Sequence, residues 1–137
     1  MGKEKIVLDT NILISALGWQ GKPYLIFLKV LNEEFELLLS EEQLDEIKHT
    51  LDYPKFSFTE EQKAHFVSIL LSVANIITIP KQLSIIIEDP EDNIILETAI
   101  IGKADYLVSG DEHLLKLQEY SGVKILTASI FLDLFSS

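Results

Sequence analysis

The feature that most constrains the fold is an apolar run that ends in a carboxylate flanked by small polar residues, and it occurs twice. The first run is Val7-Leu8-Asp9-Thr10-Asn11, and the second is Leu107-Val108-Ser109-Gly110-Asp111. Ligands of open parallel sheets bind outside the carboxyl ends of the strands. Each run is therefore typical of a strand that stops at a ligand site, and we expect Asp9 and Asp111 to meet in the folded chain.

Segments with strand and helix periodicity alternate along the sequence. Strands are expected at residues 4–9, 35–39, 76–79, 106–109 and 123–126, and helices at 12–17, 23–31, 40–51, 59–73, 93–101, 111–119 and 127–134. Residues 40–43 and 59–62 match the capping-box pattern that opens a helix. This alternation predicts an α/β fold with three layers (α/β/α) around a central, mainly parallel sheet.

Size and composition predict a single domain over residues 1–137. The apolar fraction of 47% argues against disorder. No apolar run approaches the roughly 20 residues that span a bilayer, so no membrane association is expected. The lysine-flanked first strand does not resemble a cleavable signal peptide. The absence of Cys excludes disulfides and thiolate chemistry, which fits a cytoplasmic protein.

The charge balance bears on the choice of partner. The formal net charge is −11, and all 11 basic residues are Lys. Nucleic-acid binding usually leaves a basic footprint, so this balance counts against it. Bound cations would offset part of the negative charge, and a basic partner could supply phosphate contacts. Lys22, Lys103 and Lys116 are the candidates for holding phosphates, whereas Trp19 and Tyr24 are assigned to helix packing rather than to base stacking.

A third acidic segment lies between the two runs, at Glu88-Asp89-Pro90-Glu91-Asp92-Asn93. Asp92 and Asn93 are the better site candidates because they open an apolar helix, and Asn93 can orient a carboxylate by donating a hydrogen bond. The other acids of the segment fit a loop and a helix N-cap. Acids at several strand and helix ends, without neighbouring cations, suggest a divalent metal ion.

Several acids and histidines remain ambiguous from the pattern alone. Glu42 and Glu46 are four residues apart on one helix face, so helical spacing does not distinguish them. Asp9 and Asp111 could each be helix N-caps, an alternative that is stronger for Asp111. The three histidines, His49, His65 and His113, show no metal-ligand spacing. His113 is the nearest to the predicted site in sequence, but we expect it not to contact that site.

These segments together resemble the PIN-domain family of metal-dependent ribonucleases, which includes the VapC-type toxins, in the variant with an extended central helix. The resemblance runs nearly end to end and depends on the order and spacing of four segments. It assigns the catalytic acids to Asp9, Glu46, Asp92 and Asp111, and so selects Glu46 over Glu42 by analogy. The resemblance places supporting polar residues at Asn11 and Ser109, and the family often has Thr at the position of Ser109. Asn93 is a third supporting residue, which we assign from its place at the start of the apolar helix and not from the resemblance.

The resemblance implies a Mg²⁺- or Mn²⁺-dependent endoribonuclease that hydrolyses single-stranded RNA. Oxygen ligands without thiolate or imidazole fit these two ions. Asp9 would be the central metal ligand with Asp92 and Asp111 beside it, and Glu46 would complete the cluster or orient the attacking water. The family relationship also implies an antitoxin protein as partner and a homodimer.

Two other functions compete with this interpretation. The first is a catalytically silent PIN fold that binds RNA or a protein. The second is a Mg²⁺-dependent phosphoryl-transfer domain of the haloacid-dehalogenase or receiver type. The dehalogenase type needs an Asp two residues after Asp9, where this chain has Asn11, and the receiver type needs a phosphorylatable Asp at a mid-chain strand end that the sequence lacks.

Overall fold

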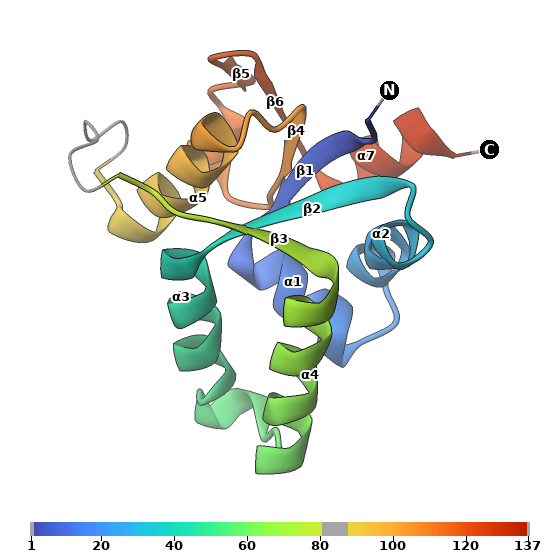
Figure 1. The fold of residues 1–137 in the computed structure, drawn as a ribbon, viewed down its shortest axis with the longest axis vertical. Coiled ribbons are helices and arrows are strands. Elements are labelled where there is room, and N and C mark those ends of the chain that lie inside the picture. The colour runs from blue at the N-terminus through green and yellow to red at the C-terminus, as the bar shows by residue number, and fades with distance from the viewer. Residues whose placement is uncertain (1, 81–87, 137) are drawn as a thin grey trace.

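A computed structural model describes residues 2–80 and 88–136, and its centre is a single twisted sheet (Figure 1). The six strands, in chain order, are β1 (Glu4–Leu8), β2 (Phe35–Ser40), β3 (Ala74–Ile77), β4 (Tyr106–Val108), β5 (Glu119–Tyr120) and β6 (Val123–Leu126). They are arranged as β3-β2-β1-β4-β6-β5, and every pairing is parallel except that of β5 with β6. The predicted α/β/α fold with a mainly parallel sheet is confirmed.

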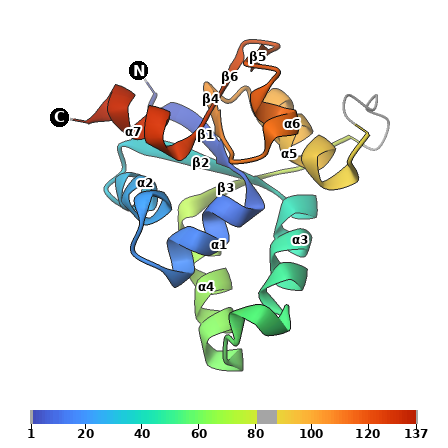
Figure 2. The same cartoon turned by 180° about the vertical axis from the view of Figure 1, so that it is seen from behind.

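Within residues 2–80 and 88–136, seven α-helices connect and cover the strands. They are α1 (Thr10–Gly18), α2 (Lys22–Leu31), α3 (Glu41–Leu51), α4 (Glu60–Val73), α5 (Pro90–Ile101), α6 (Glu112–Leu115) and α7 (Ala128–Phe135), with a 3₁₀ turn at Pro54–Phe56. Figure 2 shows α1, α2 and α7 in front of one sheet face, while α5 lies on the other face in Figure 1. The helices α3 and α4 extend away from the sheet side by side in both views. Among the described residues, no helix has the length and apolarity needed to cross a membrane.

The strand side chains alternate between two cores, which explains the three layers. In β1, Ile6 and Leu8 join the core beneath α1, α2, α4 and α7, whereas Val7 joins the core beneath α5 and α6. In β2, Leu38 likewise points to the second core, and its neighbours on either side point to the first. Successive side chains of a strand point to opposite faces, so a continuous apolar run is what a strand covered on both faces requires.

The topology fixes where a ligand site can form. Strand β1 pairs with β2 on one side and with β4 on the other, so the chain order reverses at β1. The crevice at such a switch point lies outside the carboxyl ends of the strands. Those ends lead directly into Asp9 after β1 and into Ser109 after β4.

A buried hydrogen bond fixes the start of α3 against the same end of β1. Ser40 Oγ accepts from the backbone N–H of Gln43 at 3.1 Å, as the capping pattern predicts. The Gln43 side chain does not close the capping box; its amide donates to the Leu8 carbonyl at 2.7 Å. The first turn of α3 is thereby held beside Asp9. The box predicted at Thr59 is complete, with Gln62 bonding in both directions.

The structure corrects three predicted boundaries. The third strand is Ala74–Ile77 rather than 76–79, because its partner β2 ends at Ser40, which pairs with Ile77. The helix predicted at 93–101 begins at Pro90 instead. The helix predicted at 111–119 covers only Glu112–Leu115, since Gln118 has a positive φ of 61° that stops it before the short antiparallel strand β5.

Candidate functional site

A polar cavity of about 230 Å³ lies at the switch point, outside the ends of β1 and β4. It is lined by Asp9, Thr10, Asn11, Glu46, Thr50, Tyr53, Lys55, Asp89, Glu91, Asp92 and Asp111. Six of these side chains are carboxylates, and Lys55 is the single cation that lines it within the described residues. The structure therefore places the four predicted catalytic acids, together with Asn11, around one small volume.

Asp9 is held at the floor of the cavity by a short network that spans the chain. Its carboxylate is 9% exposed and accepts from Ser109 Oγ at 2.7 Å. The backbone N–H of Asp9 donates to the Val108 carbonyl at 2.9 Å, which continues the β1–β4 pairing by one residue. Burial raises the pKa of Asp9 above its ordinary value, although the bonds from Ser109 and from the backbone of Asn11 counteract part of that rise.

Ser109 links Asp9 to Asp111, a role the sequence assigned only as polar support. Its side chain is fully buried. While it donates to Asp9, the same hydroxyl oxygen accepts from the backbone N–H of Asp111 at 2.9 Å. One hydroxyl thus sets the position of one carboxylate and the backbone of the residue that carries another. Asp111 also caps α6 by accepting from the backbone N–H of His113 at 2.7 Å.

Asp92 has the most strongly perturbed ionisation in the cavity. It is 7% exposed, and burial, together with the negative charge of Asp111, raises its pKa to about 7. Asp89 and Asp9 add to this effect at longer range. Asp89 itself caps α5 by accepting from the backbone N–H groups of Glu91 and Asp92, as expected for the acids of that segment. A nearby positive charge stabilises the ionised form of a carboxylate whose pKa burial has raised. The raised pKa of Asp92 is therefore consistent with a cation-binding site.

Glu46 enters the cavity from α3, whereas Glu42 does not line it. Burial raises the pKa of Glu46, the Thr10 hydroxyl lowers it, and the charges of Glu91, Asp9 and Asp89 raise it further. Glu42 lies one turn earlier and interacts instead with Glu97 of α5. Burial is the main cause of the raised pKa of Glu97, and the negative charge of Glu42 raises it further. Helical spacing alone did not distinguish Glu46 from Glu42. The hydrogen bond from the Gln43 side chain to the Leu8 carbonyl fixes the rotation of α3, and in this orientation Glu46 lines the cavity.

Asn93 is buried, and its amide nitrogen donates to Glu97. It thus orients a carboxylate, but Glu97 is not among the residues that line the cavity. Asn93 and Ser109 therefore stand behind the lining rather than in it.

The expectation that His113 stays away from the site is wrong. His113 Nδ1 lies 3.3 Å from Asp111 Oδ1. Ligand atoms of Asp92, Asp111 and His113 lie within 4.8 Å of one another, a separation that suits a shared metal ion. Asp9 is outside this trio in the structure; its Oδ2 is engaged by Ser109. The signal in the sequence was the spacing Asp111-Glu112-His113 at the start of a helix.

The side chains fit a metal cation. Within the described part of the chain, Asp92 Oδ2 and Glu46 Oε2 are buried and accept no hydrogen bond, and the same holds for Glu42 Oε1 one turn earlier on α3. A buried carboxylate oxygen without a partner carries a large desolvation cost, which a cation would remove. The donor set of carboxylates with one imidazole suits hard to borderline divalent ions.

The lysine at the cavity is one that the sequence did not single out. Lys22, Lys103 and Lys116 are absent from its lining, and Lys22 instead donates to Ser129 at 2.6 Å. Lys55 occupies that position, beside Tyr53. Tyr53 lies two residues beyond the end of α3 at Leu51, so helical spacing from Glu46 and Thr50 does not predict that it lines the cavity.

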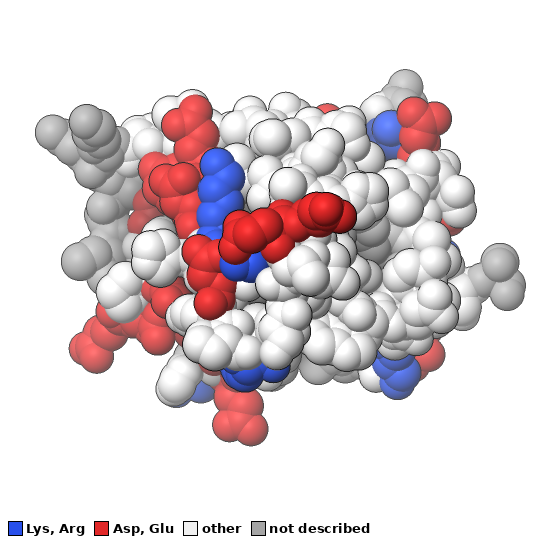
Figure 3. All heavy atoms as spheres, turned by 90° about the horizontal axis from the view of Figure 1, so that it is seen from below, with Lys and Arg blue, Asp and Glu red and all other residues white. Residues whose placement is uncertain are grey.

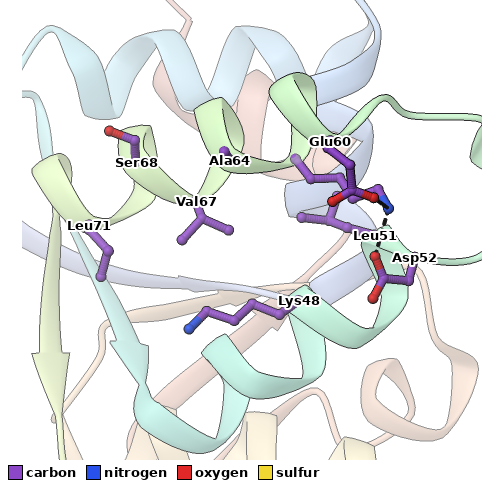
Figure 4. Close-up of a pocket in the computed structure, with 9 residues that line it drawn as sticks. Lys48, Leu51, Asp52, Glu60, Ala64, Val67, Ser68 and Leu71 are labelled. Carbon is purple, nitrogen blue, oxygen red and sulfur yellow. Dashed lines mark hydrogen bonds and ion pairs between the residues drawn. The ribbon is translucent and has the colours of Figure 1, made fainter.

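A second and larger hollow, of about 540 Å³, lies between α3 and α4 (Figure 4). Its lining is mostly apolar, with Leu51, Val67 and Leu71 prominent. Lys63 there is paired with Asp52 at 2.8 Å and with Glu60 at 2.9 Å. Both acids of this groove are paired with Lys63, so it lacks the features of a metal site.

The comparisons with known proteins agree with this geometry. Residues 5–113 match the family profile described as the PIN domain. The chain belongs to the PIN-domain family. The solved structure of VapBC2 from Rickettsia felis, bound to a DNA fragment from its promoter, contains a similar chain. The two share 21% identity with a TM-score of 0.63, over 88% of this chain and 96% of that one.

Membership of the PIN-domain family confirms the resemblance found in the sequence, and the Rickettsia structure shows that the fold is shared. No curated protein sequence matches the chain. The family profile covers residues 5–113, so the four predicted catalytic acids, Asp9, Glu46, Asp92 and Asp111, lie inside the matched region.

Proposed function

We propose that this PIN domain is a Mg²⁺- or Mn²⁺-dependent endoribonuclease that hydrolyses phosphodiester bonds of single-stranded RNA. The observation that carries the proposal is the uncompensated negative charge of the cavity. Asp92 Oδ2 and Glu46 Oε2 are buried without partners, beside Asp9 and Asp111. Such an arrangement destabilises the protein unless a ligand supplies positive charge, and this supports a bound cation.

Asp9, Asp92 and Asp111 would hold the metal, and His113 is positioned to share in that role. A bound divalent ion lowers the pKa of a coordinated water and stabilises the charge on the scissile phosphate. Glu46 would accept the proton of the attacking water as the new P–O bond forms. The bond to the leaving oxygen would break at the same time, and that oxygen would take a proton from solvent. Ser109 keeps Asp9 and Asp111 in register during this exchange.

We further propose that the chain is the toxin of a toxin–antitoxin pair and acts as a homodimer. Support comes from the shared fold with a chain of the VapBC2 assembly. The high negative charge and the lack of Arg fit a basic partner segment. Co-expression with the product of a neighbouring gene, followed by measurement of mass and of cleavage, tests both statements.

Cleavage of a labelled single-stranded RNA in Mn²⁺ is the direct test, with Asp9→Asn as the matched control. We expect the parent protein to cleave the RNA and a chelator to abolish this cleavage. Asp9→Asn should lower the cleavage rate by more than about a hundredfold, because even outer-shell changes at metal sites cost 10- to 100-fold. Full metal-dependent activity in Asp9→Asn would overturn the ligand assignment. Cleavage of duplex DNA with none of RNA would overturn the substrate.

A further inference from the structure

We infer that Tyr53 and Lys55 form the substrate-binding wall of the acidic cavity, with the Tyr53 ring stacking on an unpaired base and the Lys55 ammonium binding an adjacent phosphate. This inference rests on the proposed ribonuclease function and names the residues that hold its substrate. Both residues line the same cavity as the four acids, so a nucleotide held by them lies next to the metal ligands.

Lys55 forms no ion pair within the described residues, although six acids line the same cavity. The ion pairs found among residues 2–80 and 88–136 involve Lys29, Lys63 and His113, and none includes Lys55. Its ammonium lies 5.2 Å from the centroid of the Phe56 ring, a cation–π contact. A cation kept out of ion pairs beside six carboxylates is available for an anion that enters the cavity, and the phosphate of the substrate is that anion.

Tyr53 ends a row of aromatic rings that leads to the cavity. Its ring is parallel to that of Phe56, with an interplanar angle of 1° and centroids 6.4 Å apart. Phe56 in turn stacks on Phe58 at 5.4 Å and 17°. Tyr53 is 45% exposed and is the member of the row that lines the cavity. A base placed on Tyr53 would extend an existing stack, and base–aromatic stacking does not depend on base identity.

The segment that carries both residues is held in one shape before substrate arrives. Tyr53 N–H donates to the Thr50 carbonyl at 3.0 Å, and Phe56 N–H donates to the Tyr53 carbonyl at 3.1 Å. Pro54 restricts the backbone between them, and Ser57 ends the turn with a positive φ of 52°. Ordering a loop on binding costs free energy, so a loop that is already ordered binds its ligand more tightly.

The net negative charge of the protein opposes the binding of RNA, so attraction at the cavity itself is needed. A protein with a net charge of −11 and no Arg cannot hold RNA by a broad basic surface. One cation without an ion pair and one stacking ring at the reaction site provide local attraction without such a surface. Stacking also selects single strands, because the bases of a duplex are not free to stack on Tyr53.

The test measures binding of a short fluorescent single-stranded RNA to Asp9→Asn protein, in which cleavage is blocked. Tyr53→Ala and Lys55→Ala are compared with the conservative Tyr53→Phe and Lys55→Arg, and with Lys48→Ala, which removes a lysine from the far side of α3. We expect Tyr53→Ala to weaken binding by about tenfold or more, with Tyr53→Phe near the parent. Lys55→Ala should reduce the slope of log affinity against log salt by about 0.7, the loss of one phosphate contact on a single strand.

The outcomes separate this inference from the proposed function. The inference is wrong if Tyr53→Ala and Lys55→Ala leave the affinity for single-stranded RNA unchanged from that of the Asp9→Asn protein. It is also wrong if Lys48→Ala lowers this affinity as much as they do. Either result counts even where the parent protein cleaves RNA. If the two variants lose binding as expected but the parent protein never cleaves, the inference stands and the ribonuclease proposal fails. Undetectable binding of RNA by the Asp9→Asn protein, with the fold intact by thermal melting, overturns the inference directly.

Discussion

The two hollows on either side of α3 differ in how they treat charge. The acidic cavity, of about 230 Å³, gathers six carboxylates and leaves buried oxygens of Glu46 and Asp92 without partners. The α3–α4 groove, of about 540 Å³, has an apolar lining, and its Lys63 is paired with two acids. Figure 4 shows Asp52 and Glu60 at one end of this groove and Lys48 extending away from them. The larger hollow is therefore the less reactive one, and uncompensated charge, not volume, marks the site.

The surface view supports the same contrast. On the face seen from below α3 and α4, Asp, Glu and Lys side chains gather together in one part, while much of the rest is uncharged (Figure 3). Charges that lie together at the surface largely cancel and are screened by salt. Asp9 and Asp92 are buried and Glu46 is partly buried, so burial first, and then the charges of neighbouring carboxylates, raise the pKa values of all three.

The largest expected effect compares two glutamates on α3. Glu46→Gln should reduce metal-dependent RNA cleavage by about a hundredfold or more, because it removes the group placed to accept the proton of the attacking water. Glu42→Gln, one turn away and outside the cavity, should leave cleavage within a few-fold of the parent. Steady-state cleavage rates measure both, and equal losses in the two variants would contradict the placement of Glu46.

Metal binding should stabilise the protein through the cavity alone. At a concentration near 100 times its Kd, Mn²⁺ is expected to add about 2.7 kcal/mol to the free energy of unfolding. For a domain of this size that corresponds to a rise in Tm of roughly 10 °C. Thermal melting with and without Mn²⁺ checks this. Asp9→Asn should remove the rise, whereas Asp52→Asn in the groove should keep it; a rise that persists in Asp9→Asn would place the ion elsewhere.

Local patterns in the sequence predicted the fold and part of the acidic cavity, whereas Glu46 was selected over Glu42 only by the family resemblance. Apolar runs and caps indicated the strands and helices, and strand ends indicated Asp9 and Asp111. What these patterns missed depends on tertiary contacts. Strand β3 is shifted because β2 ends opposite Ile77, and α6 is shortened at Gln118. The approach of His113 and of Lys55 to the acids arises from how α6 and the 3₁₀ turn pack, which periodicity does not encode.

The metal-free protein should lose stability as the pH rises. Asp92 has a pKa of about 7 in the fold against an ordinary value of 3.8, so the folded state binds more protons between these values. Stability therefore falls as the pH rises from about 4 to about 7 and levels off above that range. The loss should be roughly 2 kcal/mol, less than one isolated group would give because the acids titrate together. Urea unfolding at several pH values measures it.

Two controls define that pH dependence. Asp92→Asn should flatten the profile, because the amide does not ionise. Saturating Mn²⁺ should reverse its sign, because the ion binds the deprotonated form and protons compete with it. A profile in the Asp92→Asn protein as steep as that of the parent would assign the titration to another group.

Ser109→Ala should have a smaller effect on catalysis, through position rather than contact with substrate. The variant removes the hydroxyl that joins Asp9 to the backbone of Asp111. We expect about a tenfold loss of cleavage and a matching rise in the Kd for Mn²⁺, as for outer-shell groups at metal sites. Ser109→Thr, which keeps the hydroxyl, should retain most of the cleavage activity and most of the affinity for Mn²⁺. Calorimetric titration with Mn²⁺ provides the readout that a purely structural loss would leave unchanged.

The smallest expected effect is in the groove. Asp52→Asn breaks one of the two ion pairs of Lys63, which lies at the protein surface, while Glu60 remains 2.9 Å away to compensate it. Exposed pairs contribute little because water and salt screen them. Cleavage, the Mn²⁺-induced rise in Tm and the pH profile should all match the parent protein. A change in any of these three would mean that α3 couples the groove to the cavity, since Asp52 follows Leu51 at the end of the helix that carries Glu46.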